Sequence, residues 1–298
     1  MVWERDKALD LLGEAAEVMT DDPLRQGHLL ALPHYGQVVV TGDFHGYRPN
    51  FEKLRYFADL DRCPDRHVLL HELIHLTNHA EGPCRDDDSC LLLLDALEWK
   101  VRFPEQVHFM LGNHDLAQMT NREITKSGGP SLAAFNQWVL DHFGSAGSDV
   151  LAGIDGLYRT FPLAVRCPNR IWLSHSLPGP CCVDLYDMTV FDRQWEEADL
   201  LPGGAVYEMV WGRGHDSVDL RLLAAKFDVD FFIMGHQGQD EGFSCQFDCV
   251  IILASDHPQG CFLPLDLGRR YDFDSLVGRI RYFSQIVPPQ RVHQKAAD

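Results

Sequence analysis

Residues 38–46 read Val38-Val39-Val40-Thr41-Gly42-Asp43-Phe44-His45-Gly46. A short run of β-branched residues is typical of a strand that is buried on both faces. The turn after this run carries a carboxylate, Asp43, and an imidazole, His45. Side chains two residues apart at the end of an extended strand point the same way, so both can reach one metal ion. The segment therefore predicts a buried strand that ends in a ligand-bearing turn.

The same arrangement recurs along the chain. Short apolar segments end at four further polar turns: His71-Glu72-Leu73-Ile74-His75, Gly112-Asn113-His114-Asp115, Ser174-His175-Ser176 and Gly235-His236-Gln237. Stretches with helical spacing of apolar residues, such as 5–19, 51–60 and 132–143, lie between the strands. This pattern predicts an α/β protein with sheet packed between helices. Because ligands bind at the carboxyl ends of strands in such proteins, we expect the five turns to converge on one site.

The side chains of these turns suit transition metals. Carboxylate, imidazole and amide donors favour Mn, Fe or Zn over Ca. Two ions held close together by a shared carboxylate can polarise a phosphoryl oxygen and generate hydroxide for in-line attack. A histidine next to the ligands can then protonate the leaving group. The turns therefore predict metal-dependent hydrolysis of a phosphate ester.

The motifs resemble a known family. Gly42-Asp43-x-His45-Gly46, Gly112-Asn113-His114-Asp115, Ser174-His175 and Gly235-His236, in this order, look like those of the calcineurin-like metallophosphoesterases. The resemblance is closest to the phosphoprotein phosphatase (PPP) branch, the serine/threonine phosphatases, and is extended by Phe161–Val165, Trp211–Gly214 and Ile252–Ser255. It implies an α/β (α+β) fold with a β-sandwich flanked by helices and a dinuclear metal site at the carboxyl ends of strands. We expect one domain over residues 1–298, with a core at about 8–266 and a C-terminal tail at 267–298.

The resemblance also implies roles for individual residues. It assigns Asp43 and His45 to the first ion, Glu72 to the bridge, and Asn113, His175 and His236 to the second ion. It makes His114 the proton donor and Arg213 the phosphate-binding residue. The implied reaction is hydrolysis of phosphomonoesters by metal-bound hydroxide, with a phosphorylated protein as the first substrate and a small phosphoester, such as a dinucleoside polyphosphate, as the second.

The second turn departs from the family pattern Gly-Asp-x-x-Asp-Arg-Gly. Here Glu72 replaces the bridging Asp with a side chain one methylene longer, and His75 replaces the Asp that orients the catalytic histidine. Leu76 replaces the phosphate-clamping Arg, which removes a bidentate cationic contact. His71, His75 and His79 are therefore additional candidates for the metal site. Asp115 and His257 are further candidates because each lies in or near a polar turn after a strand.

Two other functions compete with a phosphatase. His71-Glu72-x-x-His75 matches the motif of zinc metalloproteases, in which two histidines one helical turn apart bind zinc and the glutamate is the general base. That reading requires a helix at this position. The loss of the family's Asp and Arg favours instead a pseudophosphatase that binds phosphorylated partners without turnover. Metal content separates the three: two ions for the phosphatase, one zinc for the protease, and none required for the binding module.

The charge composition argues against two classes of binding partner. The chain of 298 residues has 26 basic and 44 acidic residues, a net charge of −18. This balance argues against non-specific binding to nucleic acid and against docking on anionic membranes. The start of the sequence lacks signal-peptide features and the nine cysteines are odd in number, so we expect a cytoplasmic protein with free thiols. Cys84 and Cys90 flank an acidic stretch that could hold a disulfide or a weak metal site.

Overall fold

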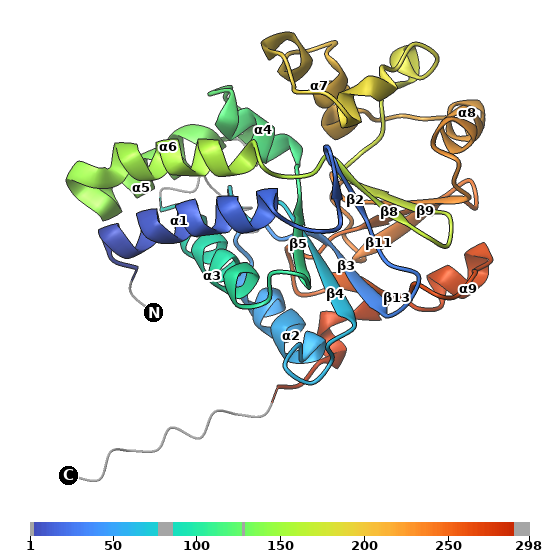
Figure 1. The fold of residues 1–298 in the computed structure, drawn as a ribbon, viewed down its shortest axis with the longest axis horizontal. Helices are drawn as coiled ribbons and strands as arrows, with labels where there is room; N and C mark the ends of the chain where they lie inside the picture. The colour runs from blue at the N-terminus through green and yellow to red at the C-terminus, as the bar shows by residue number, and fades with distance from the viewer. Residues whose placement is uncertain (1–2, 77–85, 127–128, 289–298) are drawn as a thin grey trace.

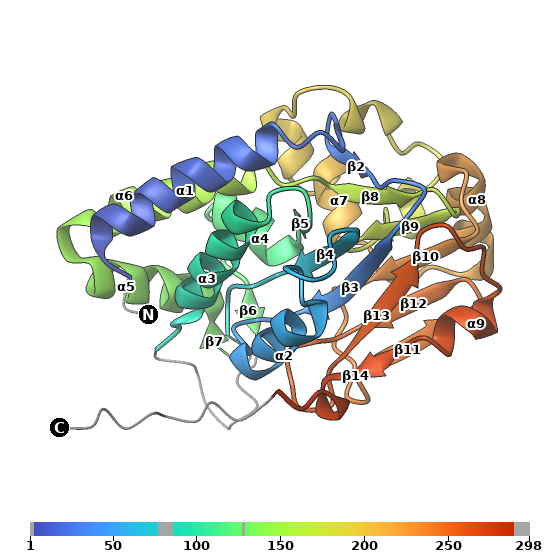
Figure 2. The ribbon, with the colours of Figure 1, turned by 60° about the horizontal axis from the view of Figure 1, so that its bottom comes forward.

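The computed structural model describes residues 3–76, 86–126 and 129–288, which form two main β-sheets. One sheet has seven strands in the order β1 (Arg25–Gln26), β2 (Leu29–Ala31), β8 (Ala164–Cys167), β9 (Ile171–Ser174), β10 (Phe231–Met234), β12 (Val250–Leu253) and β11 (Phe243–Gln246). The other has five strands in the order β14 (Arg281–Tyr282), β13 (Cys261–Asp266), β3 (Gln37–Asp43), β4 (Arg66–His71) and β5 (Val107–Met110). A two-stranded sheet, β6 (Thr125–Lys126) and β7 (Gly129–Pro130), stands apart. Figure 2 shows the two main sheets beside each other.

The two main sheets share one apolar core. Side chains from both sheets meet in a single buried cluster that includes Val38, Val40 and Leu69 of the five-stranded sheet and Leu173, Ile233 and Ile251 of the seven-stranded sheet. Val39, between two of these residues, points to the opposite face and packs in a second cluster with the helices. The valine run of β3 is therefore buried on both faces, as predicted, and the predicted sandwich is confirmed.

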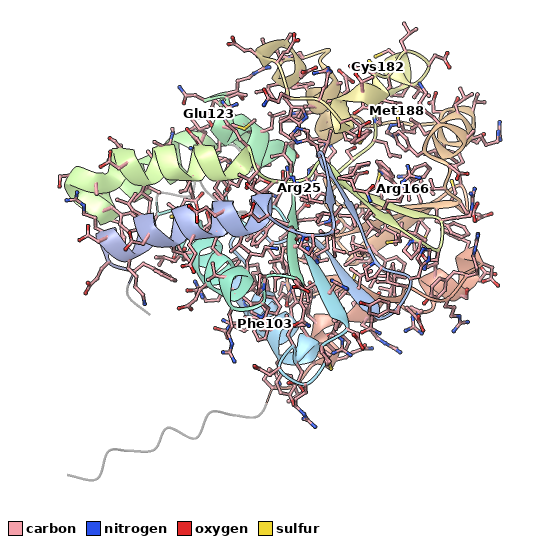
Figure 3. The ribbon with its side chains drawn as sticks, viewed as in Figure 1. Arg25, Phe103, Glu123, Arg166, Cys182 and Met188 are labelled. Carbon is pink, nitrogen blue, oxygen red and sulfur yellow. The ribbon has the colours of Figure 1, made fainter. Side chains whose placement is uncertain are left out.

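Helices cover the outer faces of the sheets (Figure 1). Four of them pack together beside the five-stranded sheet: α1 (Arg5–Thr20), α3 (Ser89–Arg102), α5 (Ser131–Phe143) and α6 (Gly147–Tyr158). The others are α2 (Arg48–Ala58), α4 (Asn113–Met119), α7 (Ala205–Trp211), α8 (Ser217–Phe227) and α9 (Phe273–Val277). Arg25, labelled in Figure 3, ties the four-helix layer to the seven-stranded sheet, because its guanidinium donates to the carbonyls of Met19 and Thr160.

Packed residues lie on both sides of the range 8–266, which the sequence predicts as the core. β14 pairs with β13, and Phe283, which follows β14, is fully buried. Trp3, before the predicted start of the core, is also buried.

The described cysteines are free thiols, in agreement with the prediction. Cys90 is buried, whereas Cys84 lies outside the described residues. No helix in the described part of the chain is long and apolar enough to cross a membrane.

The two sheets come into direct contact at the end of β3. Asp43 forms an isolated parallel bridge with Ala254, next to the end of β12, and the Asp43 carbonyl accepts a hydrogen bond from the Ser255 N–H at 3.1 Å. A Cβ atom on Gly42 would lie only 2.2 Å from the Leu253 carbonyl oxygen, so the approach requires glycine. This contact places the turn after β3 beside the turns of the other sheet.

A buried ionic cluster lies at the start of β4 and β5, away from these turns. The Lys100 ammonium lies 3.1 Å from Asp22 Oδ2, and His108 Nδ1 lies 3.2 Å from the same oxygen. Burial alone would raise the pKa of Asp22, but the hydrogen bond and charge of His108 and the charge of Lys100 together hold it well below its ordinary value. Asp22 is therefore ionised, and Lys100 is the cation that lies closest to its carboxylate among the ion pairs of the described residues.

Removing the lysine should destabilise the protein. We expect Lys100→Met to lower the free energy of unfolding by about 3 kcal/mol or more, because it leaves a buried carboxylate without its cation. Urea denaturation measures the change. Arg102→Met, on the same helix, breaks an exposed pair with Asp61 and should cost less than about 1 kcal/mol. Equal losses in the two variants would contradict a special role for the buried pair.

Candidate metal centre

The structure brings the six predicted ligands together. They lie at or just after the ends of β3, β4, β5, β9 and β10 and are between 1% and 8% exposed: Asp43, His45, Glu72, Asn113, His175 and His236. Burial of so many polar groups at one point requires that they satisfy each other or hold a ligand.

One set of donor atoms surrounds the position predicted for the second ion. Asn113 Oδ1 lies 2.8 Å from His175 Nε2 and 2.7 Å from His236 Nδ1, and these two nitrogens are 3.2 Å apart. Glu72 Oε1 lies 3.3 Å from His175 Nε2. Ligand atoms about 2.1 Å from one tetrahedral ion lie about 3.4 Å from one another, so this set has the spacing of a single coordination site.

A second set lies on the other side of Glu72. His45 Nε2 is 3.3 Å from Glu72 Oε2 and 4.0 Å from Asp43 Oδ2. His45 Nδ1 lies 3.0 Å from the Ile74 carbonyl and donates its proton there, which leaves Nε2 as the nitrogen able to bind a metal. The two oxygens of Glu72 therefore face different donor sets, as expected of a bridging carboxylate.

The charges of the centre also suit cations. Asp43 and Glu72 are buried carboxylates, and imidazoles surround them. Burial lowers the pKa of His71 to about 3 and holds the pKa of His175 well below its ordinary value, so these two rings are neutral. Bound metal ions would supply the positive charge that these imidazoles do not carry.

The turns that carry these side chains are strained. His45, Glu72, His75 and His236 have φ values of 42°, 23°, 64° and 69°, in the left-handed region that residues with a Cβ seldom adopt. Each such residue costs on the order of 1–3 kcal/mol, and such costs gather at functional sites. Strain at four residues of one site indicates that the turns are held for their ligand geometry.

His114, the predicted proton donor, is oriented by His75. The two Nδ1 atoms lie 2.9 Å apart, and His75 Nε2 lies 3.2 Å from Gln118 Oε1. Gln118 in turn donates from Nε2 to Asn136 Oδ1 at 2.8 Å. His75 thus stands in a hydrogen-bonded chain behind His114 and lies outside both donor sets. His75 belongs to neither group of candidate metal ligands among the described residues, and its place matches the orienting Asp of the family pattern.

Sequence reasoning missed Gln118 and Asn136. The signal for Gln118 was its position four residues after His114, because residues at this spacing share one face of a helix. Asn136 comes from a separate helix, α5, and no pattern in the sequence links the two.

Arg213 reaches the centre from the loop after α7. Its Nε donates to His236 Nε2 at 2.7 Å, and Nη2 lies 3.3 Å from the His236 carbonyl. The predicted phosphate-binding residue therefore lies at the edge of the donor set, next to His236.

The structure does not give the helix that a zinc protease requires. His71 is the last residue of β4, and Glu72 to His75 form an irregular turn. The His71 ring faces Asp43, with Nδ1 3.8 Å from Oδ1, whereas His75 faces His114. The two histidines therefore do not form a pair one helical turn apart. His79, the other candidate in this block, lies outside the described residues.

Two further candidate site residues, Asp115 and His257, form hydrogen bonds with the backbone of nearby turns. Asp115 Oδ2 accepts the Gly112 N–H at 2.8 Å, so the side chain fixes the start of α4. Burial raises the pKa of Asp115 to about 7. His257 Nε2 bonds the Gln239 carbonyl at 2.9 Å. Neither residue belongs to a group of candidate metal ligands among the described residues.

Comparison with known proteins is consistent with this geometry. The family model for calcineurin-like phosphoesterases matches residues 36–240. Serine/threonine-protein phosphatase 7 of Arabidopsis thaliana is 21% identical over 72% of this chain, and the chain spans 58% of the length of that relative.

Two solved structures share the fold. A serine/threonine phosphatase from Saccharomyces cerevisiae, similar to human phosphatase PP5, has a TM-score of 0.68 at 15% identity, over 97% of this chain and 92% of that chain. The cold-active protein-tyrosine phosphatase of a Shewanella species has a TM-score of 0.53 at 14% identity, over 90% and 84%.

A methyl group at Gly235 should disrupt the centre. Its Cβ would lie 2.3 Å from Asp43 Oδ1 and 2.9 Å from His71 Nδ1, so the carboxylate must move. We expect Gly235→Ala to lower metal affinity by about 10-fold or more, measured by elemental analysis after equilibration with limiting Mn²⁺. Gly238→Ala, where nothing lies within 4 Å, is the control and should bind normally. Normal binding by both variants would contradict Asp43 as a ligand.

Proposed function

Because the chain belongs to the calcineurin-like phosphoesterase family, we propose that it is a metal-dependent hydrolase of phosphate monoesters. The observation that carries this proposal is the position of Glu72, whose two oxygens face two separate sets of donor atoms 3.3 Å away. A shared carboxylate is what a pair of hydrolytic metal ions requires. Mn, Fe and Zn are the candidate metals for these donors.

Each set of residues has a role. Asp43, His45 and Glu72 would hold one ion, and Glu72, Asn113, His175 and His236 the other. When bound, such ions withdraw charge from phosphoryl oxygens and make water a nucleophile at neutral pH.

Two further residues act on the phosphate ester itself. His114, held by His75, gives a proton to the leaving oxygen. Arg213 binds phosphate oxygens through its guanidinium.

We propose phosphoserine or phosphothreonine in proteins as the substrate. The sequence relative is a serine/threonine phosphatase by name, whereas the Shewanella structural neighbour is a tyrosine phosphatase. Dinucleoside polyphosphates are the second candidate. The net charge of −18 favours basic residues around the phosphorylated side chain.

One observation favours a second function, a phosphate-binding module without turnover. Leu76 stands where the family pattern has a phosphate-clamping Arg, so Arg213 carries more of the binding. The retention of His114 next to the donor sets argues against this alternative, because binding alone does not need a proton donor.

The first test is hydrolysis of 4-nitrophenyl phosphate before and after chelation, with Mn²⁺ added back. We expect chelation to abolish turnover and Mn²⁺ to restore it, because the two carboxylates organise cations and not substrate. Asp43→Asn should lose activity through loss of one ligand charge, whereas Asp61→Asn, an exposed substitution, should keep it. A folded protein that is inactive with every metal would favour the binding module.

A second test isolates the role of His114. We expect His114→Asn to lower turnover of a phosphoserine peptide by about 10²–10⁴-fold, because the serine oxygen leaves only with a proton. Turnover of 4-nitrophenyl phosphate should fall much less, since nitrophenolate leaves without one. Metal content should stay unchanged. Loss of metal in this variant would make His114 a ligand instead of an acid.

A further inference from the structure

His71 stands where the family motif has glycine, so its side chain is a departure from that motif. It is the last residue of β4, paired in register with Asp43 at the end of β3, and it is 1% exposed. Neither ring nitrogen has a hydrogen-bond partner among the described residues. Burying two ring nitrogens without hydrogen bonds costs free energy of folding. An imidazole at this position therefore calls for a role toward a polar group beside it.

Two candidate metal ligands, Asp43 and His175, lie next to the His71 ring. His71 Nδ1 lies 3.8 Å from Asp43 Oδ1, and His175 Nδ1 lies 3.5 Å from the same oxygen. Asp43 Oδ2 accepts the His236 N–H at 2.9 Å and is the oxygen that faces His45. The carboxylate therefore has a metal-facing oxygen, Oδ2, and a rear oxygen, Oδ1.

His175 is divided in the same way. Its Nε2 faces Asn113 and Glu72 at 2.8 and 3.3 Å, and its Nδ1 faces Asp43. His71, Asp43 and His175 form a buried group whose donor atoms all lie within 4.8 Å of one another, so two roles fit His71: a metal ligand, or a residue that holds the other two in place. The His71 ring therefore lies beside one predicted ligand of each ion: Asp43 for the first ion and His175 for the second.

We propose that His71 is a positioning residue of the metal centre: its Nδ1 faces Asp43 Oδ1 across 3.8 Å, and closing this gap to a hydrogen bond would hold that carboxylate, and through it His175, in the orientation that binds metal. The proposal rests on the proposed function, because it assumes that Asp43 and His175 are ligands. Hydrogen bonds to the rear atoms of ligands fix their orientation, and losing one lowers metal affinity about 10–100-fold.

The test compares two variants of nearly equal size. Asparagine places an N–H close to the position of histidine Nδ1, whereas leucine has the same shape without a donor. We expect His71→Leu to weaken Co²⁺ binding by about 10–100-fold and His71→Asn to remain within about threefold of wild type, measured by competition with a coloured chelator. His67→Gln, a buried residue at the other end of β4, is the control for general damage to the strand and should keep wild-type affinity.

The visible spectrum of the Co²⁺-loaded protein distinguishes a positioning residue from a ligand. We expect wild type and His71→Asn to have the same band positions and intensities, because the ligand set is unchanged. Different spectra would make His71 itself a ligand and overturn the proposal, as would wild-type affinity in His71→Leu. A wild-type protein that binds no Co²⁺ would contradict the proposed function as well, whereas tight binding by His71→Leu would contradict only the role of His71.

Discussion

The close contact between β3 and β12 is the constraint on which the centre depends. Gly42 lets the backbone of β3 approach Leu253, and the bridge from Asp43 to Ala254 joins the two sheets at that point. Asp43 and Glu72 come from one sheet, whereas His175 and His236 come from the other. Without the contact the ligands of the two sheets would lie at two separate edges. The fold therefore builds the centre at the place where its two halves meet.

The metal centre also affects the stability of the fold. Asp43 and Glu72 lose most of their hydration on folding, and each such carboxylate costs several kcal/mol unless a positive charge lies nearby. The turns add backbone strain at four residues. Cations that bind only the folded chain offset both costs, and their contribution grows with metal concentration. The site by itself therefore destabilises the folded chain locally, and bound ions would offset that destabilisation.

Much of this arrangement was predictable because it depends on local patterns. The valine run of β3 and the polar turn after it lie within nine residues, and the ends of neighbouring strands must share an edge. Other features depend on distant contacts. β14 is only two residues long and is stabilised by β13, so no periodicity marks it. The spacing of His71 and His75 permits a helix, but no helix forms there, because β4 pairs with β3 and β5 up to His71.

The altered block after β4 keeps the charge of the family pattern while it changes the contacts. Two aspartates and an arginine carry a formal charge of −1, and Glu72, His75 and Leu76 carry the same formal charge when histidine is counted as neutral. The formal charge of the block is therefore unchanged. A neutral imidazole differs from a carboxylate in that it accepts at one nitrogen and donates at the other. His75 can therefore bond His114 on one side and Gln118 on the other, which continues the chain to α5. Glu72 keeps the charge of the Asp that it replaces, whereas His75 removes one negative charge and Leu76 removes one positive charge, so these two substitutions compensate each other.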